Sequence, residues 1–172
     1  GGSIGNFATT LQSINGSQTE TQVTHGATIL ATGGGEYRPD LYLYGEHPDV
    51  LTHLDMDAAV ASQDKRLAIA KSVAFIQCVG SRDDRRPYCS KICCTHSLKS
   101  ALAVKALNPK KKVTILYRDI RAYGFREDLY KQAREAGIIF IRYEPEAPPR
   151  VSADADNRLV LDVTDHVLRL PV

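Results

Sequence analysis

Three short apolar runs separated by two helical segments constrain the fold of this chain more than any other feature. The runs cover residues 72–78, 112–117 and 138–143, and each consists mostly of apolar residues. The segments 90–107 and 126–136 between them are predicted to be helices. Alternation of strand and helix predicts right-handed crossovers and a parallel sheet. We therefore predict an α/β fold that is half of a doubly wound, Rossmann-like sheet of the NAD(P)-domain type.

The residues outside this core are expected to add further β structure. Two Thr-rich runs, at 7–11 and 21–24, flank the dipeptide Asn-Gly at 15–16, which is a strong turn signal for a β-hairpin. The apolar run at 27–32 is closed by glycines and predicts a strand that is buried on both faces. One or two short helices are expected within 55–70, and a polar β-hairpin or meander near the C-terminal end of the chain.

Composition and charge limit the partners of the chain. Its 172 residues are 43% hydrophobic and carry a formal net charge of +2, which gives no reason to expect nucleic acid as a partner. No apolar run approaches the roughly 20 residues of a membrane-spanning helix, so we expect no direct membrane insertion. All four cysteines fall between residues 78 and 94, whereas a secreted disulfide protein spreads its cysteines along the chain. This clustering indicates a metal or redox site in a reducing, cytoplasmic compartment.

The loop after the first strand of the core lacks the glycines of a nucleotide-binding site. A dinucleotide-binding domain carries G-x-G-x-x-G at this point, where the glycines let the backbone approach a pyrophosphate. Here the loop contains Gly80 alone, and ten residues separate Cys78 from Cys89. The usual ligand site of the fold therefore lacks its phosphate-binding glycines and contains four thiols in their place.

The cysteines follow the spacing C-x10-C-x3-C-C. Cys89 and Cys93 are four residues apart and share one face of a helical turn, whereas Cys94 lies a further ~100° around the helix. If Cys89 precedes the helix, the last three thiols can converge, and Cys78 joins them from the strand end, where α/β folds bind their ligands. Four Cys thiolates are the ligands that a [4Fe–4S] cluster requires.

The charges around the cysteines agree with an anionic group. Between residues 78 and 99, five basic residues accompany two acidic ones, which gives a local charge of +3. A ligated cubane is a net anion, and the N-terminus of a helix favours an anion. Other interpretations stay open, because a structural zinc site also uses four cysteines and buried cysteines are often inert. A reactive dithiol is less favoured because the chain has no C-x-x-C motif.

Several strings of residues resemble one known family. They are C-V-G-S-R-D at 78–83, R-P-Y-C-S at 86–90, I-C-C-T-H-S-L-K at 92–99 and L-Y-R-D-I-R-A-Y-G-F-R-E at 116–127. The chain resembles the flavoprotein A subunit of heterodisulfide reductase, and the related A subunits of quinone-interacting oxidoreductase complexes in sulfate reducers. The resemblance extends over nearly the whole chain, and the cysteine segment is its most specific part.

The resemblance implies a thioredoxin-reductase-like flavoprotein module. In this family the matching cysteines, Cys78, Cys89, Cys93 and Cys94, bind a [4Fe–4S] cluster close to FAD, and a lysine that matches Lys99 approaches the flavin. The turn at Gly33 and Gly34 matches one that lies close to the FAD. The implied function is electron transfer between FAD and iron–sulfur centres, with no catalytic side chain. The implied partners belong to an electron-transfer complex, namely iron–sulfur and heterodisulfide reductase-like subunits together with hydrogenase or quinone-linked proteins.

The resemblance also suggests how the chain is divided. Residues 1–34 match the C-terminal β part of a FAD-binding domain, and residues 35–172 match an NAD(P)-domain-like Rossmann domain that carries the cysteines. The glycine-rich half of the FAD domain and the ferredoxin-like modules are not found in the sequence. We therefore expect a fragment of an oxidoreductase, inactive alone, whose FAD belongs to the parent protein. The alternatives are a pyridine-nucleotide-binding domain of a disulfide oxidoreductase and a zinc-stabilised interaction module.

Overall fold

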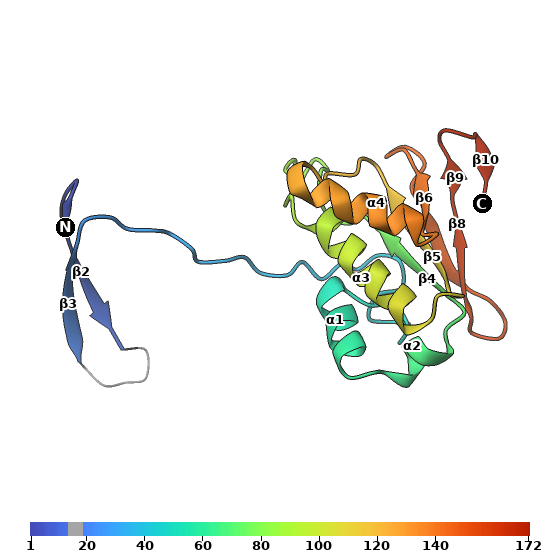
Figure 1. Cartoon of the computed structure of the whole chain (residues 1–172), viewed down its shortest axis with the longest axis horizontal. Coiled ribbons are helices and arrows are strands. Elements are labelled where there is room, and N and C mark those ends of the chain that lie inside the picture. The colour runs from blue at the N-terminus through green and yellow to red at the C-terminus, as the bar shows by residue number, and fades with distance from the viewer. Residues whose placement is uncertain (14–18) are drawn as a thin grey trace. The chain divides into compact units, whose positions relative to one another are not determined.

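The computed structural model describes residues 1–13 and 19–172 of the chain (Figure 1). The described residues form two compact units, Gly1–Glu36 and Tyr37–Val172. The predicted turn Asn15-Gly16 lies outside the described residues.

The first unit contains a small antiparallel sheet. Its strands are β1 (Gly2–Ser3), β2 (Asn6–Gln12) and β3 (Glu20–His25), and they pair in the order β1-β2-β3. The ring of Phe7 stacks on that of His25 across the β2–β3 pair, with the ring centroids 5.8 Å apart. The two Thr-rich runs therefore form paired strands, as predicted.

The prediction of a buried strand at 27–32 is wrong. These residues have no regular secondary structure, and the side chains of Ile29 and Leu30 are 89% and 87% exposed. An apolar strand is buried on both faces only when other strands pair with it and helices cover it. The described residues of this chain supply neither, so Gly33 and Gly34 follow an irregular segment and do not end a strand.

The second unit is built on a parallel sheet of three strands. They are β4 (Ser72–Ile76), β5 (Lys112–Tyr117) and β6 (Ile139–Arg142), arranged in the order β4-β5-β6. The connections run through helices α3 (Cys93–Leu107) and α4 (Glu127–Glu135). The predicted Rossmann-like α/β fold is confirmed.

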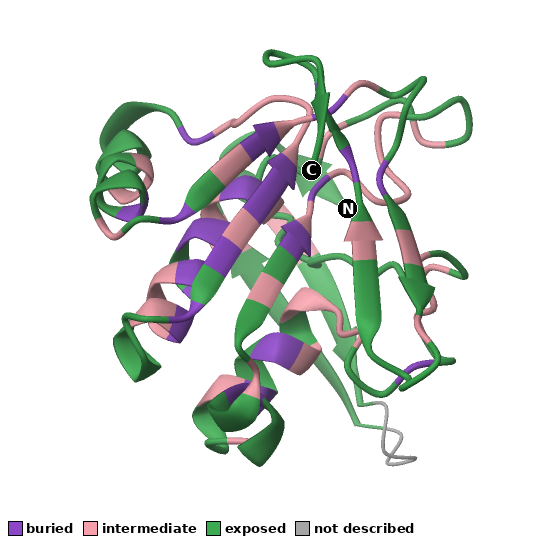
Figure 2. Ribbon diagram, turned by 90° about the vertical axis from the view of Figure 1, so that its right-hand side faces the viewer, coloured by how far each residue is buried: buried purple, intermediate pink, exposed green. Residues whose placement is uncertain are grey.

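The sheet separates two apolar clusters. The helix side is the larger, and Figure 2 shows buried positions on the strands and on the helix faces that adjoin them. Its fully buried members come from α3, α4 and β5: Leu98, Ala101, Val104, Ala133, Val113 and Ile115. On the opposite face of the sheet, Leu116 and Ile141 pack with Tyr143 and Val163. Side chains alternate between the two faces along β5, as the pleat of a strand requires.

Shorter elements surround this core. Helix α1 (His53–Ala61) packs against α3, and α2 (Lys65–Ile69) follows it. The 3₁₀ turn η1 (Gly124–Arg126) precedes α4. The C-terminal strands form two antiparallel pairs, from β7 (Arg150–Ala153), β8 (Leu159–Asp162), β9 (Thr164–Asp165) and β10 (Leu170–Pro171). The short helices within 55–70 and the C-terminal hairpin are thus confirmed.

The boundaries of two core elements differ from the prediction. Strand β4 ends at Ile76, and helix α3 begins at Cys93 and not near Ser90. Residues 77–92 are therefore irregular. The backbone of this stretch adopts left-handed conformations that neither a strand nor a helix contains.

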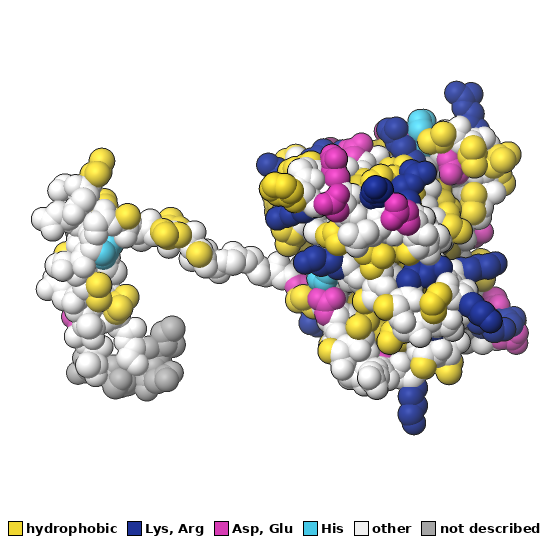
Figure 3. Space-filling view, in the orientation of Figure 1, with side chains coloured by type: hydrophobic (Ala, Val, Ile, Leu, Met, Phe, Trp, Pro, Cys, Tyr) yellow, Lys and Arg dark blue, Asp and Glu magenta, His cyan; other side chains and the backbone are white. Residues whose placement is uncertain are grey.

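The surface of the second unit is mixed in charge. On the face shown in Figure 3, basic side chains lie among acidic and hydrophobic ones and do not form one continuous patch. This distribution agrees with the net charge of +2. None of the helices in the described part of the chain combines the length and apolar character needed to cross a membrane.

Candidate metal centre

The irregular loop 77–92 lies between the carboxyl end of β4 and the N-terminus of α3, where α/β sheets bind their ligands. Four of its residues have positive φ: Cys78 (62°), Gly80 (62°), Arg82 (61°) and Lys91 (60°). Left-handed backbone is uncommon and strained for residues other than glycine, and it clusters at functional sites. The loop is therefore held in its conformation by surrounding contacts.

Tyr37 supplies one of these contacts. A Cβ atom added to Gly80 would overlap the Tyr37 ring, and the left-handed φ of Gly80 independently favours glycine. The guanidinium of Arg86 lies 3.8 Å from the centroid of the same ring, and its Nη1 donates to the Gly80 carbonyl at 3.0 Å. Ring, guanidinium and glycine form a stack that fixes the middle of the loop.

Three of the four thiols lie in one neighbourhood. The thiol of Cys94 is hydrogen-bonded to Cys93, and it also donates to the Asp119 carbonyl at 3.7 Å. The hydroxyl of Ser90 donates to the Cys93 Sγ at 3.6 Å. Cys78 is close enough to Cys93 for the two to interact electrostatically. The strand end and the helix start thus bring together thiols that are 15 residues apart in the sequence.

Cys89 makes a contact of its own within the loop. Its Sγ accepts the backbone N–H of Lys91 at 3.3 Å. All four cysteines have free thiols. Within residues 1–13 and 19–172, no three His, Cys, Asp or Glu side chains are gathered closely enough to hold one metal ion. The structure thus lets Cys78, Cys93 and Cys94 interact electrostatically, and it places Cys89 in the loop before the helix.

The protonation properties of the thiols differ. A hydrogen bond from the Cys94 thiol lowers the pKa of Cys93 to about 5, and Ser90 and the N–H groups at the start of α3 act in the same direction. The same hydrogen bond raises the pKa of Cys94, because its proton is shared with a neighbouring thiolate. Burial raises the pKa of Cys78, although the guanidinium of Arg82 opposes this. Among Cys78, Cys93 and Cys94, Cys93 is therefore the thiol that ionises most readily.

The N-terminus of α3 suits an anion. The helix begins after Ile92, whose side chain forms no cap hydrogen bond, and the N–H groups of Cys93 and Cys94 bond to the Cys93 thiol at the positive end of the helix dipole. Thiolates are the ligands that iron–sulfur clusters use, and a ligated cluster is an anion. The four cysteines therefore fit such a cluster in chemical kind and in their place at the strand end, the loop and the helix start.

Arg82 and Asp119 connect the loop to strand β5. The Nη1 of Arg82 lies 3.9 Å from the Cys78 Sγ, and its Nη2 lies 2.7 Å from the Asp119 carboxylate. Arg121 lies 3.6 Å from the same carboxylate. Burial acts to raise the pKa of Asp119, but the hydrogen bond and charge of Arg82 outweigh it and the pKa is lowered. The sequence shows Arg82 only as part of the local positive charge and carries no signal of its pairing with Asp119.

A buried polar network supports Cys78 from the core side. The Gln77 side chain is hydrogen-bonded to Ser97 of α3, whose hydroxyl also contacts the His53 Nε2 at 3.1 Å. The Tyr143 hydroxyl donates to the Gln77 carbonyl at 2.6 Å. These contacts fix the end of β4 against α1, α3 and the segment after β6. The sequence signal of this network is Gln77, a polar residue near the end of an otherwise mostly apolar run.

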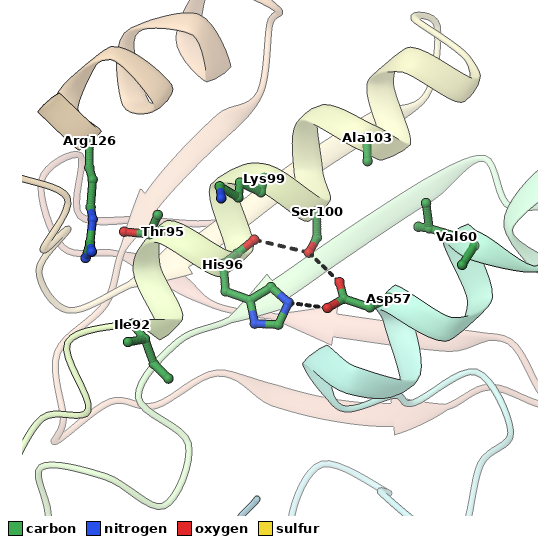
Figure 4. Close-up of a pocket in the computed structure, with 10 residues that line it drawn as sticks. Asp57, Val60, Ile92, Thr95, His96, Lys99, Ser100, Ala103 and Arg126 are labelled. Carbon is green, nitrogen blue, oxygen red and sulfur yellow. Dashed lines mark hydrogen bonds and ion pairs between the residues drawn. The ribbon is translucent and has the colours of Figure 1, made fainter. Parts of the chain in front are cut away.

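Lys99 lies on a different part of α3. It is exposed and lines a cleft of about 630 Å³ between α1, α3 and the start of α4 (Figure 4). Arg126 and Thr95 lie at the same end of the cleft as Lys99. At the other end, the Asp57 carboxylate contacts the His96 Nε2 at 2.7 Å. Lys99 and the cysteines thus occupy different surfaces of the first turns of α3.

Gly33 and Gly34 belong to the first compact unit and are exposed. Gly33 has a φ of 71°, which is the left-handed region that favours glycine. A Cβ atom at either position would meet no described atom within 4 Å. A backbone that is open on this side can approach another group closely.

No protein-family model matches the chain. Comparison with known proteins finds relatives that are all named as A subunits of heterodisulfide reductases. The chain is 40% identical over 142 residues, 73% of its length, to the A subunit of H(2):CoB-CoM heterodisulfide,ferredoxin reductase from Methanothermobacter marburgensis. It is 32% identical over an alignment of 197 positions, covering 90% of its length, to the A subunit of ferredoxin:CoB-CoM heterodisulfide reductase from Methanosarcina acetivorans. It is 34% identical over 166 positions, covering 87% of its length, to the iron-sulfur A subunit of CoB--CoM heterodisulfide reductase from Methanocaldococcus jannaschii.

The chain spans only part of each relative. It covers 22%, 24% and 25% of the lengths of the Methanothermobacter, Methanosarcina and Methanocaldococcus proteins. The similarity therefore concerns one segment of proteins that are about four times longer.

Proposed function

Since the chain is homologous to a segment of heterodisulfide reductase A subunits, as its motifs predicted, we propose that it is the cluster-binding segment of an oxidoreductase complex. In this proposal Cys78, Cys89, Cys93 and Cys94 bind one [4Fe–4S] cluster. The observation that carries the proposal is the interaction of Cys93 with both Cys78 and Cys94 at the N-terminus of α3.

The protein residues have simple roles in this proposal. The thiolates bind iron, the N–H groups of α3 offset negative charge, and the apolar faces of β4 and α3 limit access of water. When bound, the cluster would accept and pass on single electrons. Cys89 would be the fourth ligand. Because it lies in a loop, it could bind the cluster without any change in the helices and strands of the core. No side chain needs to act as a nucleophile or a general acid.

FAD is the second cofactor in the proposal, and it belongs to the longer parent protein. Lys99 would face the flavin from the cleft, and Gly33 and Gly34 would form a turn close to the FAD. The exposure of Lys99 beside Arg126 supports this, because two cations can interact with an electron-rich or anionic ligand. A fluorescence titration of the longer parent protein with FAD checks it. We expect Lys99→Gln to weaken the binding of FAD, whereas Lys131→Gln, outside the cleft, should not. Equal binding by both variants would contradict the role of Lys99.

The partners and the cellular location are also proposals. Electrons would pass between FAD and iron–sulfur centres of other subunits of the complex, including hydrogenase or quinone-linked proteins. A cytoplasmic location suits four free thiols, which a reducing compartment preserves. The fragment alone would be inactive because its electron donor and acceptor lie on other parts of the complex.

The structure gives less support to a pyridine-nucleotide site. A ribose-binding carboxylate would have to come from the end of β5, and Asp119 at that position is already paired with Arg82. The place of the phosphate-binding glycines is taken by Cys78 and its loop. The other alternative is a zinc ion bound by the same four cysteines, and metal analysis distinguishes it from an iron–sulfur cluster.

The decisive test is metal content and the visible spectrum of protein purified and reconstituted without oxygen. We expect about four irons per chain and a broad absorption that dithionite bleaches. Single substitutions Cys78→Ser, Cys89→Ser, Cys93→Ser and Cys94→Ser should each lower the iron content. Tyr88→Phe, beside Cys89 but with no thiol removed, should retain it. One zinc per colourless chain, or iron content unchanged in the four Ser variants, would contradict the proposal.

A further inference from the structure

Arg82 is placed to act on one of the proposed ligand sulfurs. Its Nη1 lies 3.9 Å from the Cys78 Sγ, while its Nη2 forms a 2.7 Å ion pair with Asp119. The side chain of Arg82 is 20% exposed, so the guanidinium is largely withdrawn from solvent. The planar guanidinium allows one side chain to contact both partners at once, which a lysine ammonium does less well.

The backbone of Arg82 is fixed as firmly as its side chain. Its N–H donates to the carbonyls of Arg86 at 2.7 Å and Tyr88 at 3.2 Å. Its own carbonyl accepts a hydrogen bond from the Arg118 Nη1 at 3.0 Å. With Asp119 holding the guanidinium, the donor is oriented toward Cys78 before any cluster binds. Such preorganisation lets a single hydrogen bond act with little ordering cost.

A cation near a ligand sulfur favours the reduced form of a cluster. Reduction adds one electron and makes no bond, so it increases the negative charge that the guanidinium stabilises. We propose that Arg82 raises the reduction potential of the cluster by donating a hydrogen bond to Cys78. This inference rests on the proposed function, because it requires a cluster bound through Cys78. It assigns to Arg82, which binds no iron, control over the potential at which the segment accepts an electron.

Arg85 offers a matched comparison within the same loop. It carries the same charge three residues further on, but it is exposed, and its backbone N–H contacts Asp83 at 3.0 Å. Solvent and salt screen an exposed charge strongly. Loss of the Arg85 charge should therefore leave the potential nearly unchanged, whereas loss of Arg82 removes a direct donor to sulfur.

The test is a redox titration of the full chain with its cluster reconstituted anaerobically, followed by the EPR signal of the reduced cluster. At the midpoint potential of the unsubstituted protein, we expect Arg82→Gln to lower the ratio of reduced to oxidised cluster about tenfold, which is 59 mV for a one-electron couple. Arg82→Lys should lower it less, and Arg85→Gln should change it by less than about twofold. Equal potentials in Arg82→Gln and Arg85→Gln would overturn the inference.

A second measurement covers the case in which Arg82→Gln does not retain its cluster. The unsubstituted chain is labelled with ¹⁵N in the guanidino nitrogens of arginine, and pulsed EPR of the reduced cluster is recorded. We expect a nitrogen coupling that changes on labelling and is lost in Arg82→Lys. A spectrum that labelling leaves unaltered would overturn the role of Arg82. Failure of the unsubstituted chain to bind iron would instead overturn the proposed function, and the iron assay precedes both measurements.

Discussion

Helices α1 and α3 begin in opposite ways. Helix α1 has a capping box, in which the Thr52 hydroxyl accepts the Asp55 N–H at 3.2 Å and the Asp55 carboxylate accepts the Thr52 N–H at 3.0 Å. Helix α3 starts after Ile92 with no such bond from the described residues, and it follows a loop with strained backbone. The first helix caps its own N-terminus with side chains, whereas the first N–H groups of the second bond to the Cys93 thiol.

Local rules of helix formation favour a side-chain cap at the N-terminus, and α3 lacks one at the site where we propose that a cluster binds. A terminus without a side-chain cap forgoes about 1 kcal/mol of stabilisation. Helix α3 offsets this through its buried face, since Leu98, Ala101 and Val104 are fully buried. The comparison implies that α3 is held by the core and α1 by its cap, and substitutions can test each half of that statement.

The largest effect is expected in the core of α3. Leu98→Ala should lower the free energy of unfolding by about 2–5 kcal/mol, because it removes a fully buried side chain and leaves a cavity. Leu107→Ala, at the 49% exposed end of the same helix, should cost less than about 1 kcal/mol. Urea denaturation of the iron-free chain measures both. Similar losses in the two variants would mean that the buried face does not hold α3.

The next effect concerns the loop before α3. Gly80→Ala should lower the free energy of unfolding by about 1–3 kcal/mol, because alanine is strained at φ 62° and its Cβ would overlap the Tyr37 ring. The same substitution should reduce iron content, since it displaces the segment that leads from Cys78. Gly35→Ala, at an open position, is the control, and an equal loss there would contradict this account.

The cap of α1 gives a pH-dependent effect. Hydrogen bonds from the backbone and side chain of Thr52 lower the pKa of Asp55 in the folded chain. Its stabilisation is therefore present above the unfolded pKa of about 3.9 and is lost as the pH falls through the lower, folded pKa. Asp55→Ala should cost about 1 kcal/mol at pH 7, with the difference shrinking in strong acid. Urea titrations over this pH range check it, and a difference independent of pH would count against the cap.

The smallest effect is a gain from adding a cap to α3. Ile92→Asp should stabilise the iron-free chain by about 0.5 kcal/mol and lower its iron content, because a carboxylate would compete with the cluster for the helix N-terminus. Ile92→Ser offers a neutral cap and should lower the iron content less. Thermal denaturation and iron analysis give the two readings. Full iron loading of Ile92→Asp would mean that the open terminus does not serve an anion.

The fold of the second unit was largely predictable because its signals are local. Strand β5 occupies the predicted residues. An apolar run between two helices forms a parallel strand in few possible topologies. The run 27–32 shows the limit of the same reasoning. Its composition resembles that of a central strand, but burial depends on partner strands that the described chain does not provide. Composition alone does not report whether such partners exist.

The sequence predicted the cysteine ligands of the candidate site, but it did not predict the contacts that position them. The spacing of the cysteines and the missing glycines indicated the loop and its chemistry. The ion pair of Arg82 with Asp119 and the contact of His96 with Asp57 join residues 37 and 39 positions apart, respectively. Such contacts depend on tertiary packing and left-handed backbone, for which a single sequence carries no periodic signal.

The Tyr37–Gly80 contact has a consequence for how this sequence can diverge. Any side chain at position 80 meets the ring at position 37, so substitutions at the two sites are not independent. A lineage that first lost the ring would meet only the backbone strain of a small residue at position 80, whereas the reverse order would pass through an intermediate that has both the strain and the clash. The order of substitutions at positions 37 and 80 therefore matters. A double-mutant cycle of Tyr37→Ala with Gly80→Ala would measure the coupling free energy between the two positions.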